Sequence, residues 1–225
     1  MFLRRGLSSC LTSSLAPRCL SSALFSSSSS SSACEVKKVG VVGLGLMGHG
    51  VAQVTSQAGY EVIAIESSKE ALETGMTRIQ GSMGKVIARS VKKGDLTESQ
   101  GNEKIQEVIA NITPTIDMSA AKDCDLIIEA IAENMDLKID FYKKLGSIVD
   151  PSCIFASNTS SLQITSMGHA SSRPEKFAGL HFFNPVQMMK LVEVIRTEQT
   201  SDETYDKIVT YSEKIGKTVG MYTIQ

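Results

Sequence analysis

The sequence lacks the features of a metal-binding, membrane-spanning or repeat protein. It has five cysteines, and three of them fall in the first 34 residues, so that only Cys124 and Cys153 remain beyond that point. Two cysteines so far apart are too few for a metal-binding set, and no metal site is predicted. No apolar run is long enough to span a bilayer, and no internal repeat is visible. We therefore expect no membrane association.

The chain also lacks an excess of basic residues. It contains 23 lysines and arginines against 24 aspartates and glutamates. Without the basic first 34 residues the net charge falls to about −4, because that segment removes three arginines and no acid. Bulk binding of nucleic acid needs a strongly basic surface, so no nucleic-acid partner is predicted.

Acidic residues are absent from the first 34 positions, which hold Arg4, Arg5, Arg18 and thirteen serines. This composition predicts a disordered transit peptide over residues 1–34 and a location in the mitochondrial matrix. The uncharged run 6–17 is too short and too polar for a bilayer span or a secretory signal. A low-complexity linker is the alternative, because a serine run alone would look much the same.

Beyond this leader, strand and helix patterns alternate. Residues 37–66 predict a strand, a glycine turn, a helix and a second strand. Helical patterns follow at 68–93, 98–112 and 133–149, and apolar strand patterns at 125–131 and 153–157. After Pro174 two more strands, a helix and a short last strand are predicted. The alternation predicts an α/β fold of the Rossmann type, in which a mostly parallel, doubly wound sheet has helices on both faces and binds ligands at the strands' carboxyl ends.

A dinucleotide site is predicted by the glycines of the first turn. Gly43, Gly45 and Gly48 form GxGxxG directly after an apolar strand, and Glu66 ends the next strand 23 residues after Gly43. The turn would hold a pyrophosphate at the helix N-terminus, and Glu66 would accept from the ribose hydroxyls and repel the 2′-phosphate of NADP. NAD is therefore the predicted cofactor, although Lys69 could offset part of that repulsion. Glycines that serve packing alone, with a solvated Glu66, are the alternative.

An acid and a base occur in the apolar stretch "GLHFFNPVQMMKLVEVI". Strand alternation places His181 and Glu193 within two strands whose faces are both apolar. A shielded carboxylate without a partner would cost several kcal/mol, so we expect the two residues to pair across neighbouring strands. Such a pair leaves one imidazole nitrogen free to act as a general base near neutral pH. A purely structural pair is equally compatible with the pattern.

Four blocks in the same order resemble the mitochondrial short-chain L-3-hydroxyacyl-coenzyme A dehydrogenases. They are "GLGLMGHG", "IAEN", "ASNTSSLQITS" and "GLHFFNPV" followed by "MKLVEVI", and the likeness runs from about Lys37 to Thr218. The resemblance implies an NAD-dependent enzyme of fatty-acid β-oxidation that converts the 3-hydroxyl of an acyl-CoA to a ketone. It implies cofactor contacts at Gly43, Leu44, Gly45, Leu46, Met47, Gly48, Glu66, Glu133, Lys138, Ser160 and Asn184.

Several of these positions have plain structural alternatives. Glu133 and Lys138 flank a helix start, where an acid in the first turn and a lysine on an exposed face need no ligand. Ser160 begins "SSLQ", which is a capping box. Asn184 precedes a proline and could simply end a strand.

The resemblance also implies roles in catalysis and in substrate binding. It assigns His181 as the base, Glu193 as its orienting partner and Ser160 as a hydrogen-bond donor to the substrate oxygen. Ser82 and Arg89 would contact coenzyme A, and they lie on one helical stripe together with Lys85 and Lys93. A solvated charged face is the alternative for that stripe.

The chain departs from the resembled family near its last residues. The family continues into an all-helical domain that closes the cleft, makes the homodimer contact and supplies a further asparagine. We therefore expect residues 35–219 to form the NAD-binding domain and 220–225 to be a divergent, truncated tail. The alternative function is a catalytically inert NAD-binding fragment or truncated isoform without the helical dimerisation domain. A related two-domain dehydrogenase acting on a free 3-hydroxy acid or sugar acid is a third possibility.

Overall fold

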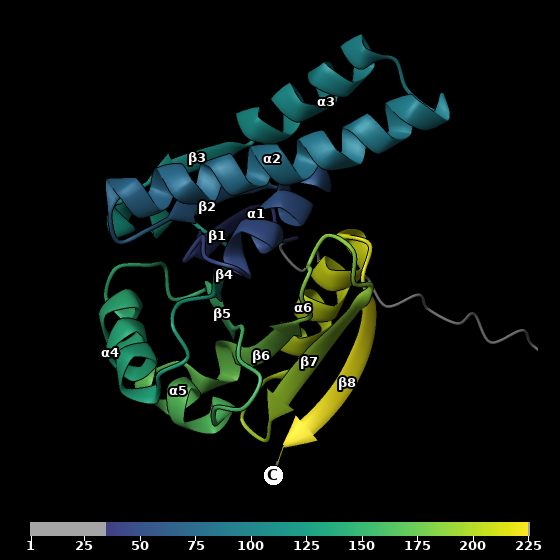
Figure 1. Cartoon of the computed structure of the whole chain (residues 1–225). Helices are drawn as coiled ribbons and strands as arrows, with labels where there is room; N and C mark the ends of the chain where they lie inside the picture. The colour runs from purple at the N-terminus through teal and green to yellow at the C-terminus, as the bar shows by residue number, and fades with distance from the viewer. Residues whose placement is uncertain (1–34, 225) are drawn as a thin grey trace, which may run out of the picture. The chain divides into compact units, whose positions relative to one another are not determined.

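The computed structural model describes residues 35–224, and the predicted transit peptide 1–34 lies outside them. The described residues form one eight-stranded sheet in the order β3-β2-β1-β4-β5-β6-β7-β8 (Figure 1). Every neighbouring pair of strands is parallel except β6 and β7. The predicted Rossmann-type α/β fold is confirmed.

The first βαβ unit has the predicted order. It consists of β1 (Lys38–Val42), α1 (Gly48–Gln57) and β2 (Glu61–Ile65). The two strands are rich in valine and isoleucine and are buried over four of their five residues, as expected for parallel strands covered on both faces. Their parallel register places the glycine turn after β1 beside the acid that follows β2.

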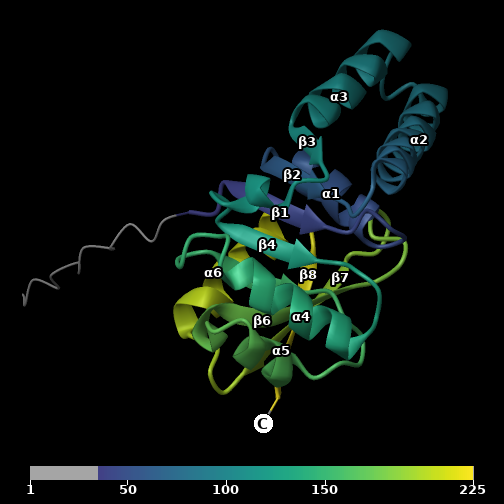
Figure 2. The ribbon, with the colours of Figure 1, turned by 90° about the vertical axis from the view of Figure 1, so that its left-hand side faces the viewer.

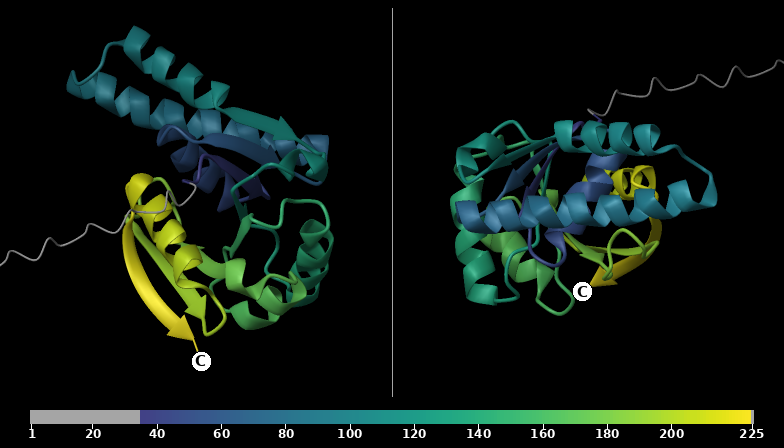
Figure 3. Two further views of the ribbon diagram at one scale, coloured as in Figure 1. Left: turned by 180° about the vertical axis from the view of Figure 1, so that it is seen from behind. Right: turned by 45° about the horizontal axis from the view of Figure 1, so that its top comes forward.

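Two helices form a hairpin between β2 and the edge strand. These elements are α2 (Lys69–Lys93), α3 (Glu98–Ala110) and β3 (Ile112–Thr115). Gly94 ends α2 with a left-handed conformation (φ 80°), and Thr97 begins α3 with a capping box. The hairpin extends past the sheet, with α2 and α3 side by side (Figure 3). No helix in residues 35–224 has both the length and the apolarity to cross a bilayer.

The middle of the chain builds the second covering layer. Its elements are η1 (Met118–Ala121), β4 (Leu126–Glu129), α4 (Met135–Gly146), β5 (Ile154–Ser157) and α5 (Ile164–Ala170). Both strands are completely buried, and α4 and α5 lie together on one face of the sheet (Figure 2). The loops that follow β4 and β5 therefore emerge at the same edge.

The final elements include the one antiparallel pair of neighbouring strands among the described residues, β6 and β7. They are η2 (Pro174–Lys176), β6 (Phe177–Phe182), β7 (Leu191–Thr197), α6 (Asp202–Lys214) and β8 (Thr218–Ile224). The last strand pairs in parallel with β7 along its whole length. The domain boundary predicted at residue 219 thus falls inside β8, and residues 220–224 continue its register.

The hydrophobic core has one cluster on each face of the sheet. On one face α1, α2 and α6 contribute Val51, Ile79, Met83 and Ile208. On the other face α4 and α5 contribute Tyr142, Leu145 and Met167. The sheet is therefore doubly wound, and its carboxyl edge remains open for a ligand.

Two glycines of α2 give a matched test of this packing. A Cβ at Gly75 would lie 2.4 Å from Cβ of Leu44, whereas a Cβ at Gly84 would meet nothing within 4 Å. Gly84→Ala should raise the free energy of unfolding by roughly 0.5–1 kcal/mol, because alanine favours the helix. Gly75→Ala should lower it by about 1–3 kcal/mol through overpacking. Urea unfolding followed by circular dichroism measures both, and a stabilising Gly75→Ala would contradict the close contact between α2 and the glycine turn.

Candidate active site

The carboxyl ends of the parallel strands converge at one edge of the sheet. The glycine turn follows β1, Glu66 follows β2, and the loop with Glu133 follows β4. Ser160 follows β5, and Asn184 follows β6. Because these strands are neighbours in the sheet, residues far apart in the sequence form one site.

The glycine turn requires glycine at two of its three motif positions. Gly43 has φ +88°, and a Cβ there would lie 2.7 Å from the Ala130 carbonyl oxygen. A Cβ at Gly48 would lie 1.6 Å from the Gly43 carbonyl oxygen. Around Gly45, by contrast, no protein atom beyond its own residue and its two chain neighbours lies within 4 Å of the position of a Cβ, so a ligand can approach the backbone there.

Glu66 is oriented by the same turn. Its Oε1 accepts from the Leu44 amide at 2.6 Å, and its Oε2 accepts from the Ser67 amide at 3.0 Å. A carboxylate can accept further hydrogen bonds on both oxygens, so these contacts leave room for a ribose hydroxyl. The ribose contact stays a prediction.

A cavity of about 510 Å³ lies between the glycine turn and the end of β6, and we call it the central pocket. Its wall includes Gly45, Met47, Glu133, Ser160, His181 and Asn184. It thus gathers most of the predicted cofactor residues in one place. With its open glycine backbone and carboxylate-held turn, the site fits a dinucleotide.

His181 and Glu193 form the predicted pair. They are directly opposite in the antiparallel register of β6 and β7, and His181 Nδ1 lies 2.8 Å from Glu193 Oε2. A carboxylate only accepts, so Nδ1 carries the hydrogen and Nε2 is the free nitrogen. The exposed fractions of the two side chains are 20% and 23%. The apolar neighbours in the sequence predicted deeper burial, but both side chains line a cavity.

This second cavity, of about 670 Å³, is the lateral pocket. Its wall includes Leu162, Ile164, Ile195 and Tyr222. Ser160 and His181 line both the lateral and the central pocket. The two cavities therefore meet at the residues predicted to touch the reacting oxygen.

Ser160 does not cap a helix, and the capping alternative is wrong. The helix α5 begins only at Ile164, and the hydroxyl of Thr159 accepts from the backbone amides of Ser161 and Leu162 instead. Ser160 contributes its backbone amide to Glu133 at 3.2 Å, and its hydroxyl makes no hydrogen bond within residues 35–224. The side chain is thus exposed at the junction of the two pockets and available for a ligand.

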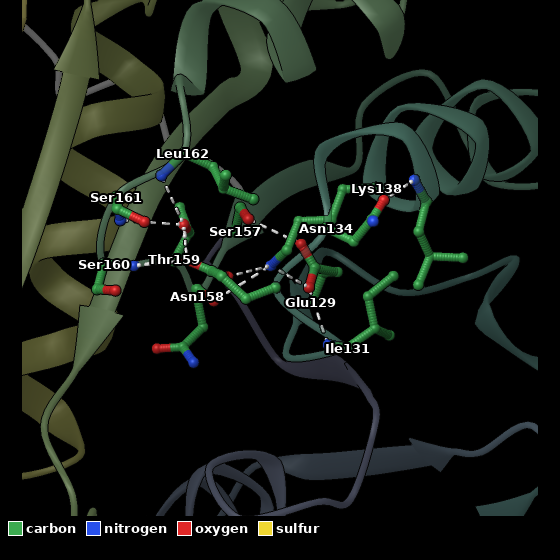
Figure 4. Close-up of polar contacts among 12 residues, drawn as sticks. Glu129, Ile131, Asn134, Lys138, Ser157, Asn158, Thr159, Ser160, Ser161 and Leu162 are labelled. Atoms are coloured by element: carbon green, nitrogen blue, oxygen red, sulfur yellow. Dashed lines mark hydrogen bonds and ion pairs between the residues drawn. The ribbon is translucent and has the colours of Figure 1, made fainter.

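Lys138 lies behind the pocket wall, and not on an exposed face as the structural alternative supposed. Its side chain is fully buried, and Nζ contacts Glu129 Oε1 at 2.8 Å and the Asn158 carbonyl oxygen at 3.3 Å (Figure 4). Nζ also lies 3.3 Å from Glu133 Oε2. All three donors of the ammonium group are used in this way. Lys138 therefore reaches the central pocket through Glu133, and a direct cofactor contact stays a prediction.

Glu129 is a site residue that the sequence analysis missed. Its buried carboxylate accepts from the Ile131 amide, Lys138, Tyr142 and Ser157. The available signal was an acid inside the apolar run "DLIIEAI". A buried charge at the end of a strand needs donors nearby, and those donors belong to the loops of the site.

Glu133 joins the loops that follow β4 and β5. It accepts from the Thr159 hydroxyl and from the Ser160 amide. Burial by itself would raise the pKa of Glu133, but the hydrogen bond from Thr159, the charge of Lys138 and the Ser160 amide together hold that pKa below its ordinary value. Glu133 thus presents a carboxylate to the central pocket.

Part of the basic stripe on α2 lines a third cavity, the helix pocket, of about 600 Å³. Ser82, Lys85 and Arg89 face it, and Lys93 does not line it. His49 also lines it and has Nδ1 2.7 Å from the Gly45 carbonyl oxygen. The prediction that Ser82 and Arg89 share a binding surface is compatible with this geometry, and the coenzyme A contact stays a prediction.

The geometry defines a class: a Rossmann-type dinucleotide-binding domain with a histidine and carboxylate pair beside the nucleotide pocket. Residues 38–222 match the family model described as 3-hydroxyacyl-CoA dehydrogenase, NAD binding domain. The chain belongs to the 3-hydroxyacyl-CoA dehydrogenase family, and the prediction of NAD as its cofactor is confirmed.

Known relatives come from bacteria and from mammals. A probable 3-hydroxybutyryl-CoA dehydrogenase of Deinococcus radiodurans is 46% identical over 80% of the chain. The mitochondrial hydroxyacyl-coenzyme A dehydrogenase of Homo sapiens is 42% identical over 85% of it. The alignments cover 62% of each relative, so the chain spans less than two thirds of their length.

A solved structure supports the same fold. The (S)-3-hydroxybutyryl-CoA dehydrogenase of Ralstonia eutropha matches with a TM-score of 0.77 and 37% identity. The match covers 85% of this chain and 65% of that one. Bacterial and mitochondrial relatives are thus similarly close to this chain.

The glycine turn yields a matched pair of substitutions. Gly45→Ala should leave the melting temperature nearly unchanged, because its methyl group meets no protein atom, and should weaken NAD binding at least tenfold as the methyl enters the central pocket. Gly48→Ala should lower the free energy of unfolding by about 2 kcal/mol or more, because its methyl group overlaps backbone. Thermal unfolding and calorimetric titration with NAD separate the two effects. Equal melting temperatures for the variants would contradict the close packing at Gly48.

Glu133 should make the contact between its loops depend on pH. Its pKa is lowered in the folded protein, so its contribution to stability is present above the unfolded pKa of about 4.3 and is lost as pH falls through the lower folded value. The free energies of unfolding of the native protein and of Glu133→Gln in urea should therefore differ at pH 6, and the difference should shrink steadily as pH falls below the unfolded pKa. A stability difference that grows as pH falls would contradict this assignment.

Proposed function

We propose that the protein acts in the NAD-dependent oxidation of L-3-hydroxyacyl-CoA to 3-ketoacyl-CoA, with His181 as the general base. The observation that carries the proposal is the position of His181 at the junction of the central and lateral pockets, with Nδ1 held by Glu193. NAD accepts the hydride in such a reaction. The residues of this chain bind and orient the substrate and the cofactor, and they move the proton.

The proton step follows from the hydrogen bond between the pair. Because Nδ1 donates to Glu193, Nε2 is the nitrogen that takes the proton of the substrate hydroxyl. The Glu193 carboxylate stabilises the imidazolium that forms. Ser160, whose hydroxyl is exposed at the pocket junction, donates to the substrate oxygen and fixes the reacting carbon beside His181.

The substrate class is supported by the helix pocket. Lys85 and Arg89 give it positive charge, and Arg78 adds to it from the same helix. Phosphates bind well to such groups, and arginine can bind them with two parallel hydrogen bonds. The apolar wall of the lateral pocket, with Ile164 and Ile195, suits the acyl part of the thioester.

The proposed setting is the mitochondrial matrix and the β-oxidation of fatty acids. It is supported by the basic, acid-free composition of residues 1–34 and by mitochondrial relatives. The intact mass of the native protein tests it, since a matrix enzyme should have lost the leader. A native mass that retains all of residues 1–34 would contradict matrix processing.

Binding of NAD without turnover is the second candidate function. It is favoured by the exposure of Met221 and Tyr222. Tyr222 lines the lateral pocket, so the rim of that pocket is in contact with water, whereas catalysis of this kind is favoured by a closed site. In the resembled family a helical domain, which also makes the homodimer contact, covers this region. Consumption of NADH with acetoacetyl-CoA by the purified protein supports the first proposal, and NAD binding without consumption supports the second.

Substitution of the base tests the assignment directly. His181→Gln should lower turnover by ~10²- to 10⁴-fold, because the proton acceptor is lost, and should leave the dissociation constant of NAD within about twofold. His169→Gln is the matched control, since His169 is exposed on α5 and lines none of the three pockets. Steady-state oxidation of 3-hydroxybutyryl-CoA and calorimetry with NAD give the two values. Unchanged turnover in His181→Gln would remove His181 from the mechanism.

A further inference from the structure

We propose that Glu133 makes the central pocket discriminate between the two redox states of the nucleotide, favouring the oxidised form, and that buried Glu129 preserves this effect by neutralising Lys138. The inference rests on the cofactor site of the proposed function and goes beyond it, because it concerns which form of the cofactor the protein retains. The two forms differ by one positive charge, which the nicotinamide ring carries only when oxidised.

The ionisable groups of the pocket wall determine the electrostatic potential that acts on a nicotinamide ring bound there. Among the residues lining the central pocket, all in the described part of the chain, only Glu133 and His181 are ionisable. Glu193 lies behind His181 and is committed to its Nδ1 at 2.8 Å. Glu133 is thus the carboxylate that faces the pocket itself.

Lys138 would cancel this charge if it were not itself paired. Its ammonium group lies 3.3 Å from Glu133 but only 2.8 Å from Glu129, and both Lys138 and Glu129 have fully buried side chains. The three groups therefore carry two negative charges and one positive charge. The surplus negative charge resides on Glu133, whose side chain is 40% exposed and borders the pocket.

The Glu129 carboxylate is surrounded by hydrogen-bond donors and acts as their acceptor. The Ile131 amide and Lys138 Nζ donate to Oε1, at 2.9 Å and 2.8 Å, and neither group can accept in return. The Ser157 hydroxyl lies 2.7 Å from Oε2 (Figure 4), and the Tyr142 hydroxyl lies 3.1 Å from the same oxygen. A buried carboxylate with four donors holds Lys138 on the side away from the pocket.

A fixed charge beside the nicotinamide acts on one redox state more than on the other. The adenosine, the phosphates and both riboses are common to the two forms, so their contacts cancel in the ratio of the two dissociation constants. One partly screened charge at close range changes that ratio by about tenfold. Loss of a mere positioning contact would weaken both forms by the same factor.

The experiment measures binding, not turnover. The dissociation constants of NADH, from its fluorescence, and of NAD⁺, from calorimetry, are determined at one pH for the native protein and for Glu133→Gln. The amide keeps the shape of the side chain and can still accept from Thr159. The ratio of the NAD⁺ constant to the NADH constant should rise about tenfold in Glu133→Gln, mainly through weaker NAD⁺ binding.

A second variant, Glu129→Gln, changes a charge behind the pocket wall, and its NADH affinity shows whether the pocket is still formed. In Glu129→Gln the charge of Lys138 is no longer neutralised and offsets Glu133, so the same ratio should rise in the same direction. Glu107→Gln is the matched control, because Glu107 is exposed on α3 and lines no part of the central pocket. Its ratio should equal that of the native protein.

Two results would overturn the inference. They are an unchanged ratio in Glu133→Gln, with or without an equal weakening of both nucleotides, and a ratio that moves as much in Glu107→Gln. A native protein that binds neither nucleotide would overturn both this inference and the proposed cofactor site. A shifted ratio in a protein without turnover would support the inference and remove only the catalytic part of the proposed function.

Discussion

The buried carboxylate of Glu129 is the constraint on which the arrangement of the site depends. It ends β4 and accepts from the loop after β4, from the first turns of α4 and from the end of β5. Through Lys138 it reaches Glu133, which in turn holds Thr159 and the Ser160 amide. Removing one partner of a buried ion pair typically costs about 3–5 kcal/mol, so both loops depend on this buried group for their position.

Local patterns were enough to predict the βαβ unit with its glycine turn. The glycine turn and Glu66 belong to one βαβ unit, and their geometry follows from strand, turn and helix signals within thirty residues of sequence. The edge strand β3 was missed because it is four residues long and contains Pro114, which ordinarily argues against a strand. Such a strand forms only because β2 already offers an edge.

The positions of the other site residues depend on contacts between residues that are distant in the sequence. His181 and Glu193 were predicted to pair, but only the antiparallel register of β6 and β7 places them directly opposite. The motif at Ser160 predicted a helix cap, and the chain uses the Thr159 hydroxyl instead because the helix begins later. Lys138 has the spacing of an exposed helical lysine. No local pattern in the sequence shows that it pairs with Glu129, nine residues earlier, and is buried by that contact.

The close approach of α2 to the glycine turn links two parts of the site that are otherwise separate. Gly75 leaves room for Leu44, and the amide of Leu44 is the group that orients Glu66. The same helix carries Arg89 at the wall of the helix pocket. The basic side chains of the helix pocket thus stand on a preorganised element, which reduces the entropy lost when a ligand binds. Because α2 packs directly against the turn at Gly75, the wall of the helix pocket and the support of Glu66 share one contact.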